Sequence, residues 1–265
     1  MKRLLIAVLS TVTLTWLTSS LPSHAAVASV SLDWSKLTVA TFGISGGTAP
    51  HATLSAQSTS ISGSASDPED GAESFSHTLS NWTSSSFQSA HTNHADATVS
   101  ASSSTFSSSA SATSSSLCCG TGASSAVSRA ANFSLDGPGS VIFSVPYSYS
   151  LTSSTDFSDS TDLHINGSAS LTSFVGGASE SSSGSSALDW FSFMGPSSAS
   201  GTLLFGLVSS TGGTGSVNFQ LSTNSFNFSG GGVIPEPSLV LELVAGLSAL
   251  IVMARRRTAP NAAIE

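Results

Sequence analysis

Charged residues are scarce in this chain. They make up only 8% of its 265 residues, against about 25% in a typical globular domain. Most of the basic residues lie at the two ends, as Lys2, Arg3, Arg255, Arg256 and Arg257, which leaves only Lys36 and Arg129 between them. Nucleic-acid binding needs clustered Lys and Arg side chains to contact phosphates, so the sequence excludes that class of partner. So few ionisable side chains also argue against an ordinary cytosolic enzyme.

Cysteine is nearly absent as well, because the chain has two and they are adjacent, at Cys118 and Cys119. Free thiols do not persist in an oxidising compartment. Adjacent cysteines close only a strained ring, and separate partners would have to come from another chain. An inert turn pair, a vicinal disulfide and an intermolecular cross-link therefore remain open. The chain also lacks a Gly-x-Ser-x-Gly elbow and a nucleotide loop, so we predict no catalytic residue and no cofactor.

The first 26 residues have the three parts of a secretory signal peptide. Lys2 and Arg3 form the positive region, and an apolar stretch follows from Leu4 to Leu17. Small residues then precede a cleavage site, which we predict directly after Ala25. The sequence therefore predicts export.

The C-terminal end contains a second apolar segment, Leu239 to Ala254, in which Glu242 is the one charged residue. As a helix it would be about 24 Å long, slightly short of a ~30 Å hydrocarbon core. Pro235 and Pro237 prevent an earlier helix start. The arginines that follow stop translocation of the chain and remain on the cytoplasmic side of the membrane. We therefore predict a transmembrane helix over 239–254, with a cytoplasmic tail at 258–265.

This C-terminal order, with Pro235, Glu236 and Pro237 followed by the apolar helix and then by Arg255, Arg256 and Arg257, resembles a PEP-CTERM sorting segment. Such segments occur on exported proteins of Gram-negative bacteria that make exopolysaccharide. The resemblance implies that a membrane-embedded exosortase recognises the Pro-Glu-Pro triplet and processes the protein. The arginines would form the positive-inside retention cluster.

Between the two ends the sequence alternates with a period of two, which is typical of strands. Serine, threonine and glycine are poor helix formers, and no stretch has helical spacing. We therefore predict an all-β antiparallel sandwich of about ten short strands, with turns at 136–139 and 211–214. The expected strands are 30–34, 37–44, 53–62, 73–83, 96–113 (interrupted by a bulge or turn), 126–135, 140–151, 162–174, 188–194, 201–208 and 216–228.

The predicted organisation has five parts. They are a signal peptide (1–26), a Ser/Gly-rich body (27–229), a glycine linker (230–234), the sorting segment (235–257) and the tail (258–265). Within the body, the Ser/Ala tracts 100–116 and 179–186 contribute little apolar surface. We therefore expect these two tracts to be loose.

Potential metal ligands occur in three places. His91, His94 and Asp96 lie close together, with His77 upstream. Zinc needs three or four converging ligands, so exposed loop histidines are the simpler interpretation. Two acidic segments, 67–73 and 156–162, offer carboxylates suited to calcium, but neither has EF-hand spacing. We predict no metal site and interpret both segments as solvated turns.

The sequence thus predicts an exported, non-enzymatic protein of the cell surface or extracellular matrix. Its expected partners are the secretion machinery, an exosortase, the cytoplasmic membrane and exopolysaccharide. The alternative is an adhesin module that binds surface carbohydrate or ice, because the same C-terminal segment has been associated with ice-binding proteins. The Thr-x-Thr triplets typical of ice-binding strands occur here only within the signal peptide. Exposed Trp82 and Trp190 would favour sugar binding, and burial of both would favour a structural role.

Overall fold

The computed structural model describes residues 25–113, 120–152, 159–176, 178–191 and 197–227. Cys118, Cys119 and Asp156 lie outside these residues. The linker, the Pro-Glu-Pro triplet, the predicted transmembrane helix and the arginine cluster also lie outside them, as does nearly all of the signal peptide. Among the described residues, no helix has the length and apolar character needed to cross a membrane.

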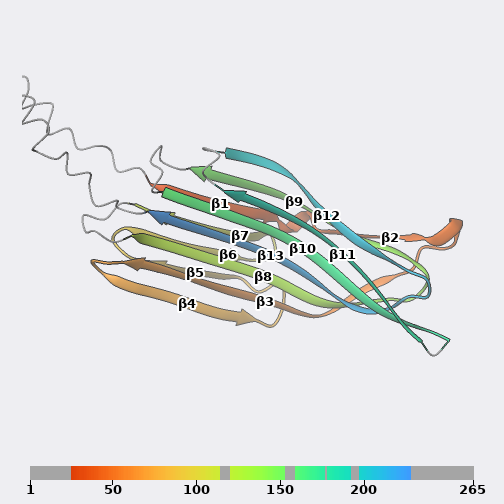
Figure 1. The fold of residues 1–265 in the computed structure, drawn as a ribbon. Helices are drawn as coiled ribbons and strands as arrows, with labels where there is room; N and C mark the ends of the chain where they lie inside the picture. The colour runs from red at the N-terminus through yellow and green to blue at the C-terminus, as the bar shows by residue number, and fades with distance from the viewer. Residues whose placement is uncertain (1–24, 114–119, 153–158, 177, 192–196, 228–265) are drawn as a thin grey trace, which may run out of the picture.

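The described chain forms two antiparallel sheets that pack face to face (Figure 1). Sheet A has the order β12-β9-β1-β7-β6-β5, with β2 also paired to β9. Its strands are β1 (Ala26–Asp33), β2 (Thr38–Gly43), β5 (Ser86–His91), β6 (Ala95–Ala101), β7 (Thr105–Ala112), β9 (Gly139–Thr152) and β12 (Ser197–Ser209). Two 3-10 turns, η1 (Trp34–Lys36) and η2 (Ile44–Gly46), flank β2.

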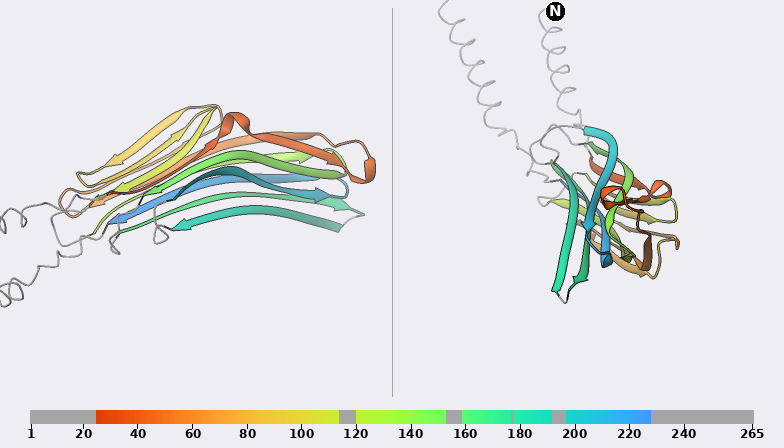
Figure 2. Two further views of the ribbon diagram at one scale, coloured as in Figure 1. Left: turned by 90° about the horizontal axis from the view of Figure 1, so that it is seen from above. Right: turned by 90° about the vertical axis from the view of Figure 1, so that its right-hand side faces the viewer.

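Sheet B has six strands in the order β11-β10-β13-β8-β3-β4. These are β3 (Ala52–Asp67), β4 (Gly71–Leu79), β8 (Thr121–Leu135), β10 (Asp159–Val175), β11 (Ala178–Phe191) and β13 (Gly213–Asn227). The strands run along the long axis of the molecule (Figure 2).

The all-β prediction is confirmed, but the expected strand number and length are wrong. The described residues form thirteen strands instead of about ten, and the longest has 17 residues. The expected run 96–113 divides into β6 and β7 at the turn Ser102–Ser104, as the change of parity predicts. Tract 179–186 is not loose but lies within β11, and tract 100–116 includes all of β7.

One end of the sandwich holds both ends of the described body (Figure 1, left). At this end, which we call proximal, the Ser225 hydroxyl donates a 2.7 Å hydrogen bond to the Ala26 carbonyl. The first and last strands are therefore directly linked there. The opposite end, which we call distal, contains η2 and the turns after β8 and β12.

The core changes character along this axis. Near the proximal end it contains a cluster of small buried side chains, namely Ala65, Ala90, Ala95, Ala97, Ala110 and Ala123. Farther along, aromatic rings fill the space between the sheets. The rings of Phe143 and Phe205 stack at 5.4 Å, and Phe219 packs edge-on against Trp34 at 5.0 Å. The burial of these large side chains is the main source of stability, at about 25 cal/mol per Å² of apolar surface.

Candidate functional site

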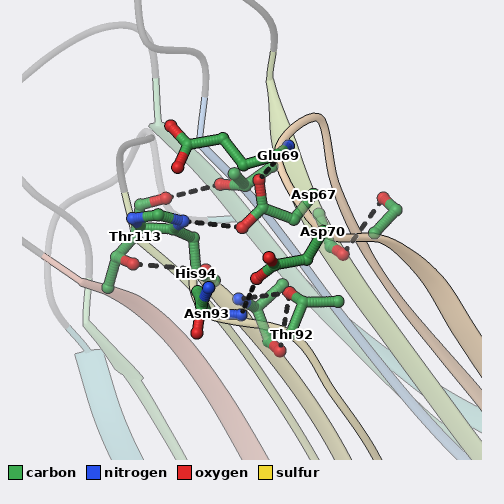
Figure 3. Close-up of polar contacts among 11 residues, drawn as sticks. Asp67, Glu69, Asp70, Thr92, Asn93, His94 and Thr113 are labelled. Carbon is green, nitrogen blue, oxygen red and sulfur yellow. Dashed lines mark hydrogen bonds and ion pairs between the residues drawn. The ribbon is translucent and has the colours of Figure 1, made fainter. Parts of the chain in front are cut away.

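The densest group of ionisable side chains lies at the proximal end, where two hairpin turns meet (Figure 3). One turn joins β3 to β4 in sheet B and carries the acidic residues of segment 67–73. The other joins β5 to β6 in sheet A and carries His91 and His94. Because β4 and β5 are the edge strands of different sheets, contacts between these turns connect the two sheets.

Three carboxylates of the acidic hairpin accept hydrogen bonds from the histidine hairpin. Asp67 Oδ2 lies 2.6 Å from Nδ1 of His94. Asp70 accepts from the backbone N–H of Asn93 at 2.9 Å. Glu73 accepts from the backbone N–H of His91, also at 2.9 Å. The two sets of residues that the sequence suggested separately therefore form one cluster, whose contacts clamp sheet A to sheet B.

Asp67 is the best enclosed member of this cluster. Its side chain has no exposed surface, whereas the His94 side chain is 26% exposed. Burial alone would raise the pKa of the Asp67 carboxyl, because a charge is costly away from water. The backbone N–H of Glu69, at 2.9 Å, and the His94 ring outweigh burial, so the pKa of Asp67 lies below its ordinary value.

His91 pairs with a different carboxylate. It lies directly opposite Asp96 on the β5–β6 ladder, and its Nδ1 bonds to that side chain. This hydrogen bond raises the pKa of the exposed His91 ring above its usual value. His91 and His94 therefore do not converge on one point. Within the described part of the chain, no group of three or more His, Cys, Asp or Glu residues could hold a metal ion.

The second acidic segment is only partly described, through Asp159 and Asp162 at the start of β10. Side chains three apart on a strand point to opposite faces, so these two carboxylates cannot share a calcium ion. Farther along the same strand, His164 bonds to Asp189 on β11, where the two residues are cross-strand neighbours.

A buried hydroxyl cluster lies between the sheets, formed by Ser108, Ser125 and Thr223. The Oγ atoms of Ser108 and Ser125 are 2.6 Å apart. Oγ1 of Thr223 lies 3.0 Å from the first and 2.9 Å from the second. The further hydrogen bonds of these serines go to backbone carbonyls. Without a histidine or carboxylate in this hydrogen-bonded set, the hydroxyls satisfy one another and lack a base that would make one of them a nucleophile.

Trp82 and Trp190, whose exposure was expected to distinguish sugar binding from a structural role, have different environments. Trp82 is 5% exposed, and its Nε1 donates to the carbonyls of Ser58 and Ala130 at 3.0 and 3.1 Å. It is a core residue and has no free face for a sugar ring. Trp190 is partly buried, with its ring centroid 5.0 Å from that of Tyr149.

Arg129 is a functional candidate that the sequence did not single out. It lies on β8, at a position that faces the core, and its side chain is completely buried. The guanidinium carbon sits 4.5 Å from the Trp34 ring centroid and 5.0 Å from that of Phe106. Its Nη2 donates to the Ser102 carbonyl at 2.6 Å, whereas Nε and Nη1 have no hydrogen-bond partner among the described residues. It is one of only two basic residues between the ends of the chain, which was a signal in the sequence, but only the fold places it in the core.

Comparisons with protein-family models, curated proteins and solved structures find no match to this chain. Of the predicted sorting and cleavage residues, only Ala25 is described, and it is exposed directly before β1. Asp67, Asp70 and Glu73 each have a hydrogen-bond partner on the facing turn. The cluster is therefore suited to joining the sheets.

Proposed function

We propose that this chain is an exported, non-enzymatic protein of the cell surface or extracellular matrix. In this proposal a PEP-CTERM segment at 235–257 directs its sorting, and an exosortase recognises the Pro235–Pro237 triplet and processes the protein there. One observation carries the proposal, namely the order of Pro-Glu-Pro, apolar segment and arginine cluster behind an N-terminal signal peptide. Each part has a physical reason, because the apolar segments enter a bilayer and the arginines remain on the cytoplasmic side.

The arrangement of the body supports this proposal. Ala25 is exposed, whereas Ala26 is fully buried as the first residue of β1. Cleavage after Ala25 would therefore release the signal peptide without removing a core residue. Because β13 ends at the same end of the sandwich, a C-terminal anchor would hold the proximal end near the membrane and direct the distal end outward.

The outer face of sheet A is also suited to a hydrated matrix. Ser29 lies between Ser109 and Ser150 across three strands, and Ser31 similarly lies between Ser107 and Ser148. Such rows present hydroxyls to water and polysaccharide without adding charge. Hydroxyl groups both donate and accept hydrogen bonds, so they can replace water around sugar chains.

The alternative role, a carbohydrate- or ice-binding adhesin, has less support from the same residues. Trp82 is enclosed and hydrogen-bonded within the core, which removes one of the two candidate stacking rings. Trp190 alone keeps partial access, on the strand at the edge of sheet B. A structural or matrix role therefore remains the better proposal.

Cell fractionation with intact-mass measurement tests the sorting proposal. We expect the wild-type chain to lose its C-terminal segment and to reach the surface or medium. The Pro235→Ala/Glu236→Ala variant should keep that segment and stay in the cytoplasmic membrane. Ser238→Ala, which changes a neighbouring residue outside the triplet, is the matched control and should behave like wild type. Identical C-termini and locations for the wild type and the triplet variant would refute processing at this motif.

A further inference from the structure

The outer face of sheet A is divided into a hydroxyl part and an apolar part. Near the proximal end its rows consist of serines, as described above. At the distal end β2, β9 and β12 lie side by side and present large apolar side chains instead. We call this region the distal apolar patch and define it as Ala40, Phe42, Ile142, Leu204 and Val208.

Cross-strand register places these residues on one surface, because directly opposed residues point to the same face. Phe42 and Val208 both lie opposite Ser140, from the two sides of β9. In the next row, Ile142 lies between Ala40 and Gly206. Leu204 lies one row farther toward the proximal end, opposite Ser144.

The patch is open to solvent. Phe42 is 53% exposed, and Leu204 and Val208 are each 58% exposed. Seven large hydrophobic residues are exposed in the described chain, and these three lie within three consecutive rows of one face. Clustering of this kind marks an interaction surface, whereas single exposed apolar residues need no explanation.

Charge identifies the partner that fits this surface. Residues 38–43, 139–152 and 197–209, which form the three strands, include no charged side chain. The whole chain has a formal net charge of −8, so two copies repel each other over most approaches. At a surface that is both apolar and free of charge, a second copy can approach without this electrostatic repulsion.

We propose that the distal apolar patch is a self-association surface that docks on the same patch of a second copy of this chain. The contact is isologous, with the two patches related by a two-fold axis. The outer faces of the two sheets A then stack at about 10 Å, the usual spacing of packed sheets. The middle row, with Ala40, Ile142 and Gly206, is flanked by Phe42 and Val208 on one side and by Leu204 on the other.

The size of the patch sets the strength of this contact. Six residues at about 3.3 Å and three strands at about 4.8 Å give roughly 300 Å² per copy. The total of roughly 600 Å² is below the 1,200–2,000 Å² of stable complexes. The pair is therefore weak and depends on concentration, and it becomes populated where many copies are held close together.

Chemical cross-linking of the purified full chain tests this proposal. Ser144→Cys places a thiol within the patch, in a background in which Cys118→Ser and Cys119→Ser remove the natural thiols. Ser109→Cys places a matched thiol on the serine part of the same face. With a short bis-maleimide reagent, we expect the Ser144→Cys chain to form covalent dimers roughly tenfold faster than the Ser109→Cys chain, with a rate that rises with protein concentration.

A charge reversal then identifies the partner. Adding Leu204→Glu should lower dimer formation roughly tenfold, because like charges facing each other across a contact are strongly unfavourable. Leu204→Lys should do the same, and a mixture of the Glu and Lys chains should restore mixed dimers, which a mass tag on one chain detects. Phe174→Glu is the control, since Phe174 is 77% exposed on sheet B and lies outside the patch.

Three results would overturn the proposal. One is equal cross-linking of the Ser144→Cys and Ser109→Cys chains, which would indicate association through another segment. The second is an unchanged dimer yield in Leu204→Glu chains whose circular dichroism matches that of wild type, with Val208→Glu as the replacement variant should Leu204→Glu not fold. The third is failure of the oppositely charged chains to recover mixed dimers, which would assign the patch to another occupant, such as residues 228–265 of the same chain.

Discussion

Replacing the buried Arg129 with methionine tests whether the core of this sandwich tolerates an unpaired cation or depends on it. The guanidinium is fully enclosed, and within the described part of the chain Nε and Nη1 have no hydrogen-bond partner. The ion pairs found among the described residues do not include it. Methionine has a similar length, is unbranched and fits irregular core spaces, so it removes the charge while largely keeping the volume.

The opposing contributions can be compared directly. Burial lowers the pKa of Arg129 from its ordinary value to about 10, which corresponds to about 3 kcal/mol of cost to the charged form. Against this stand one charge-assisted hydrogen bond to Ser102, worth about 1.5–3 kcal/mol, and cation–π contacts worth about 0.5–2 kcal/mol. These nearly cancel, and methionine adds apolar burial. We therefore expect Arg129→Met to be neutral or to raise the free energy of unfolding by about 1–3 kcal/mol.

Urea unfolding of the purified protein, followed by tryptophan fluorescence, measures this change. Trp34 and Trp82 are buried in the core that contains Arg129, so their emission reports unfolding of the relevant region. Arg129→Ala is the matched control and should lose about 3 kcal/mol or more, since it leaves a cavity. Ser102 is only partly buried as a residue, so we expect water to replace the lost donor. A loss above 1 kcal/mol in Arg129→Met would refute this reasoning and make the cation a net stabiliser.

Three further predictions concern the contacts between the sheets. Asp67→Asn weakens the bond to His94 and should cost about 1–3 kcal/mol near neutral pH. Because the folded pKa of Asp67 lies below 3.8, the stability that the carboxylate contributes is present above that value and is lost as the pH falls through the lower folded pKa. The variant should therefore lose less stability than wild type on acidification, and parallel curves of melting temperature against pH for the two proteins would contradict this. Ser125→Ala removes the hydrogen bonds of the Ser125 hydroxyl to Ser108, Thr223 and the Ser109 carbonyl, while the Ser108–Thr223 contact remains, and should cost about 1–3 kcal/mol by denaturant unfolding; an unchanged midpoint would mean that the Ser125 hydroxyl contributes nothing. Gly184→Ala places a Cβ only 1.9 Å from the Gly206 carbonyl oxygen, so β11 must move away from β12 at a cost of about 1–3 kcal/mol; a thermal midpoint equal to wild type would exclude this close approach.

The sequence predicted strands well wherever apolar residues alternate with polar ones. The expected run 140–151 corresponds to β9, Gly139–Thr152, because Phe143, Val145 and Tyr149 all have to reach the core. The sequence did not predict a strand for the serine-rich half of β11. That segment is a strand because its backbone pairs with β10 residue by residue, and backbone hydrogen bonds do not depend on apolar side chains. Short β5 was missed for a similar reason, since it has few apolar residues.

The sequence pointed to the separate residues of the two-hairpin cluster but not to their contacts with one another. Acidic turn residues and nearby histidines can be found by inspection, and solvated loops were the simpler interpretation. The pairing of Asp67 with His94 depends on β4 and β5 being edge strands of different sheets, which local patterns do not encode. Arg129 shows the same limit, because its parity on β8 points it inward but gives no information about the rings that enclose it.

The alternation of apolar and hydroxyl side chains by itself determined that this body would be all-β, because a two-residue period gives each strand one face for the core. Composition by itself led us to expect no nucleic-acid partner, because phosphate binding needs clustered cations. Only the tertiary structure decided which strands share a sheet, which carboxylate meets which histidine, and where exposed apolar residues gather on one face. Those outcomes depend on pairing between segments far apart in the chain, and the free energy of such pairing comes from packing across the whole sandwich.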